Sequence, residues 1–99
     1  MQRLAFLICG LSLALAPAFG AKGDPAKGKA VFEQCGVCHN ADSNEKKMGP
    51  GLKGLFTTKK ATEAKVRHRI DEGGNGMPAY KDMLSAEEKD NLIAYLKTL

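Results

Sequence analysis

Cys35-Gly36-Val37-Cys38-His39 is the stretch that decides how the rest of this 99-residue chain is interpreted. Two cysteines three positions apart, followed directly by a histidine, form the pattern to which c-type haem is attached. Each thiol can add to one vinyl group of the porphyrin, and both vinyl groups lie on the same side of the ring. One helical turn places both sulfurs and the imidazole against that side. The motif therefore predicts one haem c per chain, bound covalently through Cys35 and Cys38, with His39 as an axial ligand of the iron.

A zinc half-site and a redox-active dithiol are the alternative interpretations of this motif. A structural zinc site needs four ligands, usually from two Cys/His pairs, and the only other Cys and His are Cys9 and His68. A thioredoxin-like dithiol is expected beside a βαβ unit, and the sequence shows no such unit. Haem attachment is the interpretation that fits.

The first 20 residues predict an export signal that is cleaved. Gln2 and Arg3 form a weakly positive start, residues 4–15 are uncharged and mostly apolar, and small residues permit cleavage after Gly20 or after Ala18. The apolar run is shorter than the ~20 residues of a membrane-spanning helix, although retention as an anchor is the alternative. Haem is attached to such thiols outside the cytoplasm, so the signal and the motif support each other. The expected location is the periplasm of a bacterium.

Residues 21–99 are expected to form one small domain. Arg3 leaves with the signal, so the 15 basic residues fall to 14 against 11 acidic ones, and the formal charge becomes +3. This near balance, without a basic stripe, argues against nucleic-acid binding. A core of this size is marginal on apolar burial alone, and a covalently held porphyrin would complete it. The cofactor uses both remaining cysteines, so no disulfide is expected.

The mature domain is predicted to be all-α with long loops. Asp24 reads as an N-cap with Pro25 at the first helical position, which predicts a helix to about Gln34. A second helix is predicted over residues 62–72, with Gly73 as its C-cap.

The last helix is predicted to begin at the capping box Ser85-Ala86-Glu87-Glu88. Its apolar stripe follows at helical spacing and consists of Leu92, Tyr95, Leu96 and Leu99. The segments between the helices are rich in glycine and polar residues, and they predict loops. No strands are expected.

The haem iron has six positions, and the sixth can be filled by another side chain of the chain. The ring supplies four positions and His39 a fifth. The other candidates are Met48, Met77, Met83 and His68. Met77 is favoured because Gly76 lets the backbone come close to the ring and Pro78 holds the chain extended. The sequence thus predicts His39 and Met77 as the two metal ligands.

The remaining candidates have weaker support. Met48 is too close in sequence to the attachment site to reach the opposite face of the ring. Met83 is expected to fill space in the core, and His68 is expected on a solvated helix face. An open or water-bound sixth position is the other alternative.

Four blocks of sequence occur in an order that resembles the class I cytochromes c, specifically the small bacterial monohaem kind. They are a helix with Gly28 and Phe32, then Cys35-x-x-Cys38-His39, then Gly49-Pro50-Gly51-Leu52-Lys53-Gly54-Leu55-Phe56, and last Gly76-Met77-Pro78 followed by Leu92-Ile93-Ala94-Tyr95-Leu96. Together they cover residues 24–99. The resemblance implies a class I cytochrome c fold, in which three main helices with long loops wrap around one covalent haem.

The resemblance also implies roles for further residues. The carbonyl of the residue matching Pro50 accepts a hydrogen bond from the far ring nitrogen of the ligand histidine, which orients the imidazole. The residue matching Leu52 packs on the porphyrin. The first and last helices would cross near Gly28.

The chain departs from the family pattern in two places. It has no Trp, whereas many members use one to anchor a haem propionate, so Arg67, Arg69 and Lys60 are considered for that role instead. The segment between Leu52 and Met77 is shorter than in the mitochondrial relatives, and one haem edge would therefore be more exposed.

A six-coordinate iron with two protein ligands leaves no position for a substrate. The sequence therefore predicts a soluble, monomeric electron carrier, not an enzyme, that exchanges single electrons with periplasmic or membrane redox partners. His/Met ligation raises the reduction potential. Two alternatives remain: an open-site haem enzyme or gas sensor, and a haem-bearing subunit of a larger complex. After signal cleavage no stable membrane insertion is expected.

Several lysines would either steer acidic partners toward the haem edge or form an ordinary solvated surface. These residues are Lys46, Lys47, Lys53, Lys59, Lys60 and Lys81.

Overall fold

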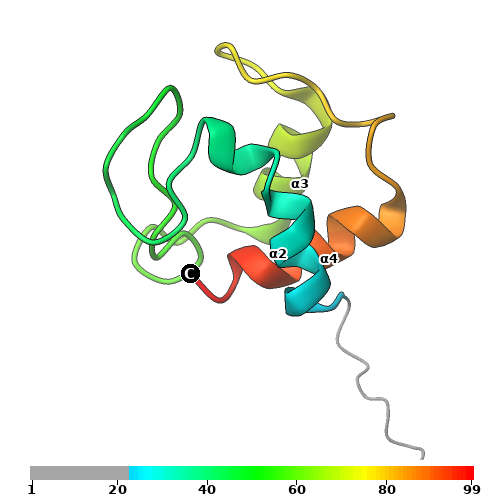
Figure 1. The fold of residues 1–99 in the computed structure, drawn as a ribbon, viewed down its shortest axis with the longest axis horizontal. Helices are drawn as coiled ribbons and strands as arrows, with labels where there is room; N and C mark the ends of the chain where they lie inside the picture. The colour runs from blue at the N-terminus through cyan, green and yellow to red at the C-terminus, as the bar shows by residue number, and fades with distance from the viewer. Residues whose placement is uncertain (1–22) are drawn as a thin grey trace, which may run out of the picture.

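The fold is described from a computed structural model, which defines residues 23–99. It contains α2 (Pro25–Phe32), the short 3-10 helix η2 (Cys35–Val37), α3 (Glu63–Glu72) and α4 (Ala86–Leu96) (Figure 1). Within residues 23–99 there is no strand, and a single isolated bridge joins Gly74 to Met77. The predicted all-α architecture is confirmed. The predicted export signal lies outside the described residues.

The start of each helix and the end of α3 are capped by residues at or next to the predicted boundaries. The Asp24 side chain accepts a hydrogen bond from the first turn of α2 at 2.9 Å. Thr62 caps α3 in the same way, and Gly73 closes it with a φ of 69°, a left-handed conformation that favours glycine. At α4, both hydrogen bonds of the capping box between Ser85 and Glu88 are present. These local signals fix where the three helices begin and where α3 ends.

The first helix is shorter than predicted. It ends at Phe32 rather than near Gln34, and the chain then tightens into η2. The N–H groups of Cys38 and His39 both donate to the carbonyl of Cys35, each at 3.0 Å. This compact turn, rather than a continuation of α2, places the two cysteines and the histidine close together.

The close crossing of α2 and α4 is confirmed. A Cβ atom at Gly28 would overlap the backbone carbonyl of Asn91, so only glycine fits there. One turn along, the rings of Phe32 and Tyr95 lie 5.4 Å apart at an angle of 55°, within the range of favourable aromatic pairs. Asn91 is buried at the crossing and accepts a hydrogen bond from the backbone N–H of Asp24 at 2.7 Å. The crossing therefore holds the start of the domain against its last helix.

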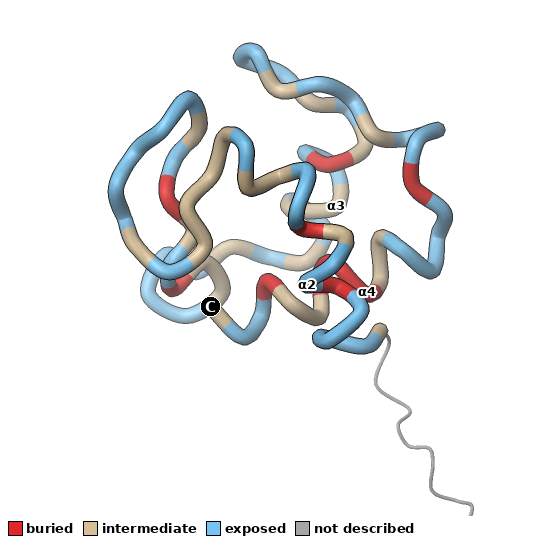
Figure 2. Tube along the Cα trace, viewed as in Figure 1, coloured by how far each residue is buried: buried red, intermediate tan, exposed pale blue. Residues whose placement is uncertain are grey.

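The core is small and centres on α4 (Figure 2). Its buried apolar side chains are Phe32, Ile70, Leu84, Leu92, Ile93 and Leu96. Cys35, Leu52 and Tyr80 pack against this core while remaining half-buried. One apolar core therefore contacts three segments: the cysteine motif, the loop after it and the loop near Met77.

The expectation for Met83 is wrong, because its side chain is 66% exposed. The chain turns at this point, with the N–H groups of Met83 and Leu84 both donating to the carbonyl of Tyr80. That turn directs Leu84 into the core and leaves Met83 outside. The predicted stripe of the last helix also extends too far, since α4 ends at Leu96.

No helix within residues 23–99 is long and apolar enough to cross a bilayer.

Candidate functional site

The two cysteines of the motif are free and half-buried at the end of α2. Burial raises the pKa of the Cys35 thiol, and the neighbouring Cys38 raises it further. Without a cofactor, Cys35 is therefore protonated at neutral pH and is a weak nucleophile. The geometry supplies two accessible thiols on one turn.

His39 is held by a hydrogen bond that fixes its ring nitrogens in different roles. Its Nδ1 lies 2.8 Å from the carbonyl oxygen of Pro50, which is the contact that the family resemblance implies. A carbonyl only accepts, so Nδ1 carries the proton and Nε2 keeps its lone pair. Within the described residues Nε2 has no hydrogen-bond partner. Its lone pair is therefore available to a metal.

Gly49 presses against the edge of this imidazole. A Cβ atom added there would come 2.5 Å from Cε1 and 2.8 Å from Nδ1 of His39. The Gly49 N–H donates to the carbonyl of Cys38 at 2.8 Å, and the Lys47 ammonium donates to the carbonyl of Gly36 at 2.9 Å. Three hydrogen bonds, made by Lys47, Gly49 and Pro50, thus hold this loop beside the histidine. Sequence reasoning identified Gly49 only as part of a turn.

Replacing Gly49 with alanine should displace the imidazole and destabilise the domain. Inserting a methyl group into a filled site costs about 1–3 kcal/mol, so the denaturation midpoint of the haem-loaded protein should fall accordingly. Gly36→Ala is the matched control, because a Cβ there meets only Phe32 at an ordinary 3.5 Å. Equal midpoints for the two variants would show that the His39 ring does not require a residue without a side chain at position 49.

Met77 lies in a loop whose backbone is shaped by glycines. Gly73, Gly74 and Gly76 have φ values of 69°, 123° and 91°, all in the region that other residues rarely adopt. The backbones of Gly74 and Met77 exchange two hydrogen bonds at 2.9 and 3.0 Å. Met77 is half-buried. These bonds hold the backbone that carries the thioether in a tight turn.

Tyr80 connects this loop with the cysteine motif. Burial raises the pKa of the Tyr80 hydroxyl, and the nearby Cys35 and Cys38 raise it further. In the view of Figure 1, η2 and the loop after α3 lie at the same end of the molecule, away from the crossing of α2 and α4. The fold thus brings the attachment motif and the Met77 loop to one region. Tyr80 was not predicted, although an aromatic residue three positions after Met77 was a usable signal.

The other ligand candidates lie elsewhere. Met48 is 81% exposed, and its sulfur is 3.9 Å from the sulfur of Cys38, beside the attachment turn. His68 is on the exposed surface of α3, as expected. Leu52 is half-buried and packs against the core, and its N–H donates to the carbonyl of Asn40 at 2.8 Å.

The arginines considered for the propionates are occupied by other contacts. Arg67 on α3 pairs with Asp90 on α4 at 2.7 Å. It also pairs with Glu63, one turn earlier on α3, at 3.8 Å. Arg69 donates to the carbonyl of Gly73 at 3.3 Å. Lys60 is exposed.

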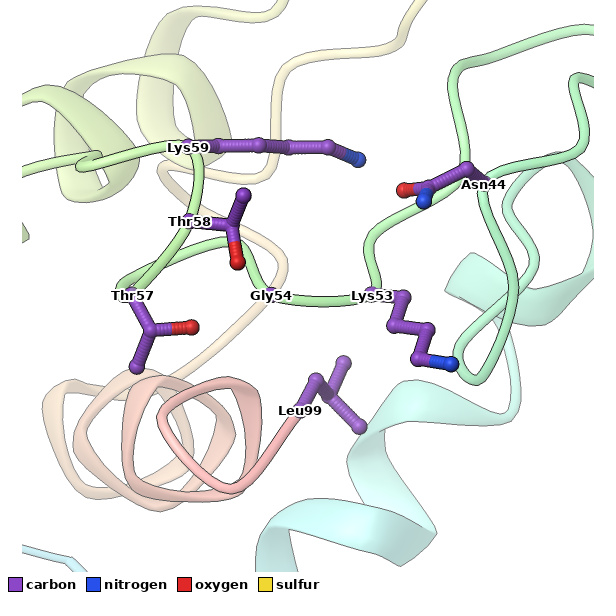
Figure 3. Close-up of a pocket in the computed structure, with 7 residues that line it drawn as sticks. All are labelled: Asn44, Lys53, Gly54, Thr57, Thr58, Lys59 and Leu99. Atoms are coloured by element: carbon purple, nitrogen blue, oxygen red, sulfur yellow. The ribbon is translucent and has the colours of Figure 1, made fainter.

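A cavity of about 310 Å³ lies apart from these residues, beside the end of the chain (Figure 3). Its lining residues are Asn44, Lys53, Gly54, Thr57, Thr58, Lys59 and Leu99. None of the predicted site residues lines it. Lys59 is already engaged, because its ammonium donates to the carbonyl of Gly51 at 2.6 Å.

Within residues 23–99 there is no group of three or more His, Cys, Asp and Glu side chains that could hold a metal ion. The thiols, the free imidazole nitrogen and the thioether instead match the donor set of a covalently attached haem, so the residues present fit that group.

Comparison with known proteins gives a consistent result. Residues 23–96 match the family described as "Cytochrome C oxidase, cbb3-type, subunit III". A cytochrome c2 of Rhodopseudomonas palustris is 37% identical, over 74% of this chain and 58% of that protein. A cytochrome c2 of Agrobacterium tumefaciens (strain II Chrys) is 33% identical, over 76% of this chain and 91% of that protein.

Among solved structures, cytochrome c6 of the diatom Phaeodactylum tricornutum is similar with a TM-score of 0.61 and 28% identity, over 77% of this chain and 93% of that one. Several relatives are longer: the chain matches 58% of the Rhodopseudomonas palustris protein and 43% of a cytochrome c2 from Blastochloris viridis.

Proposed function

This chain belongs to the class I cytochrome c family, and we propose that it is a soluble electron carrier that passes single electrons between redox proteins. Members of the family bind one covalent haem c, and Cys35-x-x-Cys38-His39 is the attachment sequence in this chain. Haem c supplies a one-electron couple that needs no bound substrate. The proposal rests most directly on the hydrogen bond between His39 Nδ1 and the Pro50 carbonyl.

The residues around the site would each contribute to electron transfer. The thiols of Cys35 and Cys38 would form the thioether links, and His39 Nε2 and the Met77 sulfur would be the axial ligands. Pro50 keeps the proton on Nδ1, so the imidazole stays in one orientation in both oxidation states. Leu52 would keep water away from one face. A fixed ligand set and a dry apolar setting keep structural change small when one charge is added.

His/Met ligation favours a raised reduction potential. We propose that the carrier accepts electrons from quinol-side donors and passes them to oxidases or reductases, acting in the bacterial periplasm as a monomer. Contact with each partner should be small and brief, since a carrier has to dissociate quickly.

A redox titration followed by optical spectroscopy tests the ligation and the function together. We expect a single one-electron transition, and a weak far-red absorption band in the oxidised protein that reports the Met–Fe(III) bond. Absence of that band would contradict His/Met ligation and favour the open-site enzyme or sensor. Gel filtration of the native extract tests the other alternative, because a carrier elutes at the size of a monomer and a subunit elutes with its complex.

A further inference from the structure

We propose that Lys89 is a positioning residue for Met77: it holds the loop that carries this methionine against α3 and α4, and so determines how firmly the thioether stays on the haem iron. The inference rests on the proposed ligand role of Met77. It concerns a residue that is far from the attachment motif in sequence and that no sequence pattern singled out.

One ammonium group joins three elements of the fold. Lys89 lies on α4, and its Nζ is 2.7 Å from Oδ1 of Asp71 on α3. The same Nζ donates to the backbone carbonyl of Lys81 at 3.0 Å. Lys81 is four residues after Met77 in the loop that joins α3 to α4. The side chain of Lys89 therefore connects both helices to the ligand loop.

The contact is more sheltered than an ordinary surface ion pair. The Lys89 side chain is 12% exposed and that of Asp71 is 25% exposed. By contrast, the side chains of Glu63 on α3 and Lys97, the residue just after α4, form a pair in which they are 41% and 48% exposed. Exposed pairs contribute little to stability, whereas removing one partner of a buried pair leaves an uncompensated charge and costs more.

The carboxylate of this contact is charged at neutral pH. Close contact with the Lys89 ammonium lowers the pKa of Asp71, burial opposes this, and the charges of Lys89, Arg67 and Lys81 lower it further. The pair is therefore a true salt bridge between α3 and α4, with the loop carbonyl as a third member.

Met77 is bonded mainly within its own turn, so its loop is joined to the helices only by the contacts that follow it in the chain. Its backbone pairs with Gly74, and the next residue, Pro78, has no N–H to donate. The following bonds to α3 run from Tyr80 N–H to the Ile70 carbonyl at 2.8 Å and from Lys81 N–H to the Asp71 carbonyl at 3.2 Å. Lys89 adds a hydrogen bond from α4 to the carbonyl of Lys81 in the same segment.

Competition by imidazole measures how often the loop releases the iron. Free imidazole binds the ferric protein only when Met77 has left, so its apparent affinity rises in proportion to the released fraction. Lys89→Met keeps the length of the side chain and removes the ammonium. We expect imidazole to bind this variant about tenfold more tightly than the wild type, because the anchor is intermediate between an exposed and a buried pair. Lys89→Arg, which retains charge and donors, should restore most of the difference.

Asp90→Asn is the matched control. Asp90 is the next residue on α4 and pairs with Arg67 of α3 at 2.7 Å, with both side chains 31% exposed, but it makes no bond to the loop. Imidazole affinity in this variant should stay within about twofold of the wild type. Amide exchange at Tyr80 and Lys81 gives a second readout, and it should accelerate in Lys89→Met only.

The outcomes separate this inference from the proposed ligation. A wild-type protein without the far-red band would remove Met77 as the ligand and the inference with it. A wild-type protein with the band, together with unchanged imidazole affinity and exchange in Lys89→Met, would overturn the anchor alone. Equal changes in Lys89→Met and Asp90→Asn would also overturn it, because they would reflect general loosening of α3 from α4. If Lys89→Met does not fold, Asp71→Asn provides the same comparison, since it removes the charge that holds the ammonium.

Discussion

Replacing Met77 with alanine should lower the reduction potential by roughly 0.2 V, a fraction of the ~0.8 V range over which axial ligands tune haem. The thioether favours the ferrous state, and its loss leaves water or a stronger donor in the sixth position. The far-red band of the oxidised protein should disappear in the same variant. An optically monitored redox titration measures both quantities.

Met83→Ala and Met48→Ala are the controls for this substitution. Both side chains are exposed, at 66% and 81%, and they should change the potential little. A potential and spectrum of Met77→Ala that match the wild type would exclude Met77 as the ligand. If His68 were the ligand instead, His68→Ala would change the reduction potential and the spectrum. The exposed position of His68 on α3 argues against this.

The elements of this fold that were predictable from sequence are those set by local chemistry. The N-caps at Asp24 and Ser85 and the C-cap at Gly73 depend on side chains or backbone angles within a few residues, so the sequence identifies them directly. The close packing at Gly28 was also foreseen, because glycine inside a helix is costly unless another backbone crosses there.

What the sequence did not predict depends on contacts between distant segments. The outward position of Met83 results from a turn that sends Leu84 inward instead. The contact of Gly49 with His39 depends on how a ten-residue loop folds back, and the Lys89 anchor joins three elements. Hydrophobic periodicity carries no information on such polar and steric contacts across the fold.

The double substitution Cys35→Ala with Cys38→Ala should abolish covalent haem and prevent stable folding. Both thioether links are lost, so denaturing electrophoresis followed by haem staining should give no signal at the size of this chain. Cys9→Ala is the control, because Cys9 lies in the predicted export signal outside the described residues. It should leave the staining unchanged.

The loss of folding follows from the size of the core. Within residues 23–99 six apolar side chains are buried, and Cys35, Leu52 and Tyr80 are covered only in part. A porphyrin that buries several hundred Å² of apolar surface contributes about 10 kcal/mol, which is comparable to the whole stability of a domain of this size, roughly 5–15 kcal/mol. Circular dichroism of the double variant should therefore lack the helical signal of the wild type. A cooperative thermal transition in that variant would show that the helices α2, α3 and α4 suffice to hold the fold, and that the cofactor adds redox chemistry rather than structure.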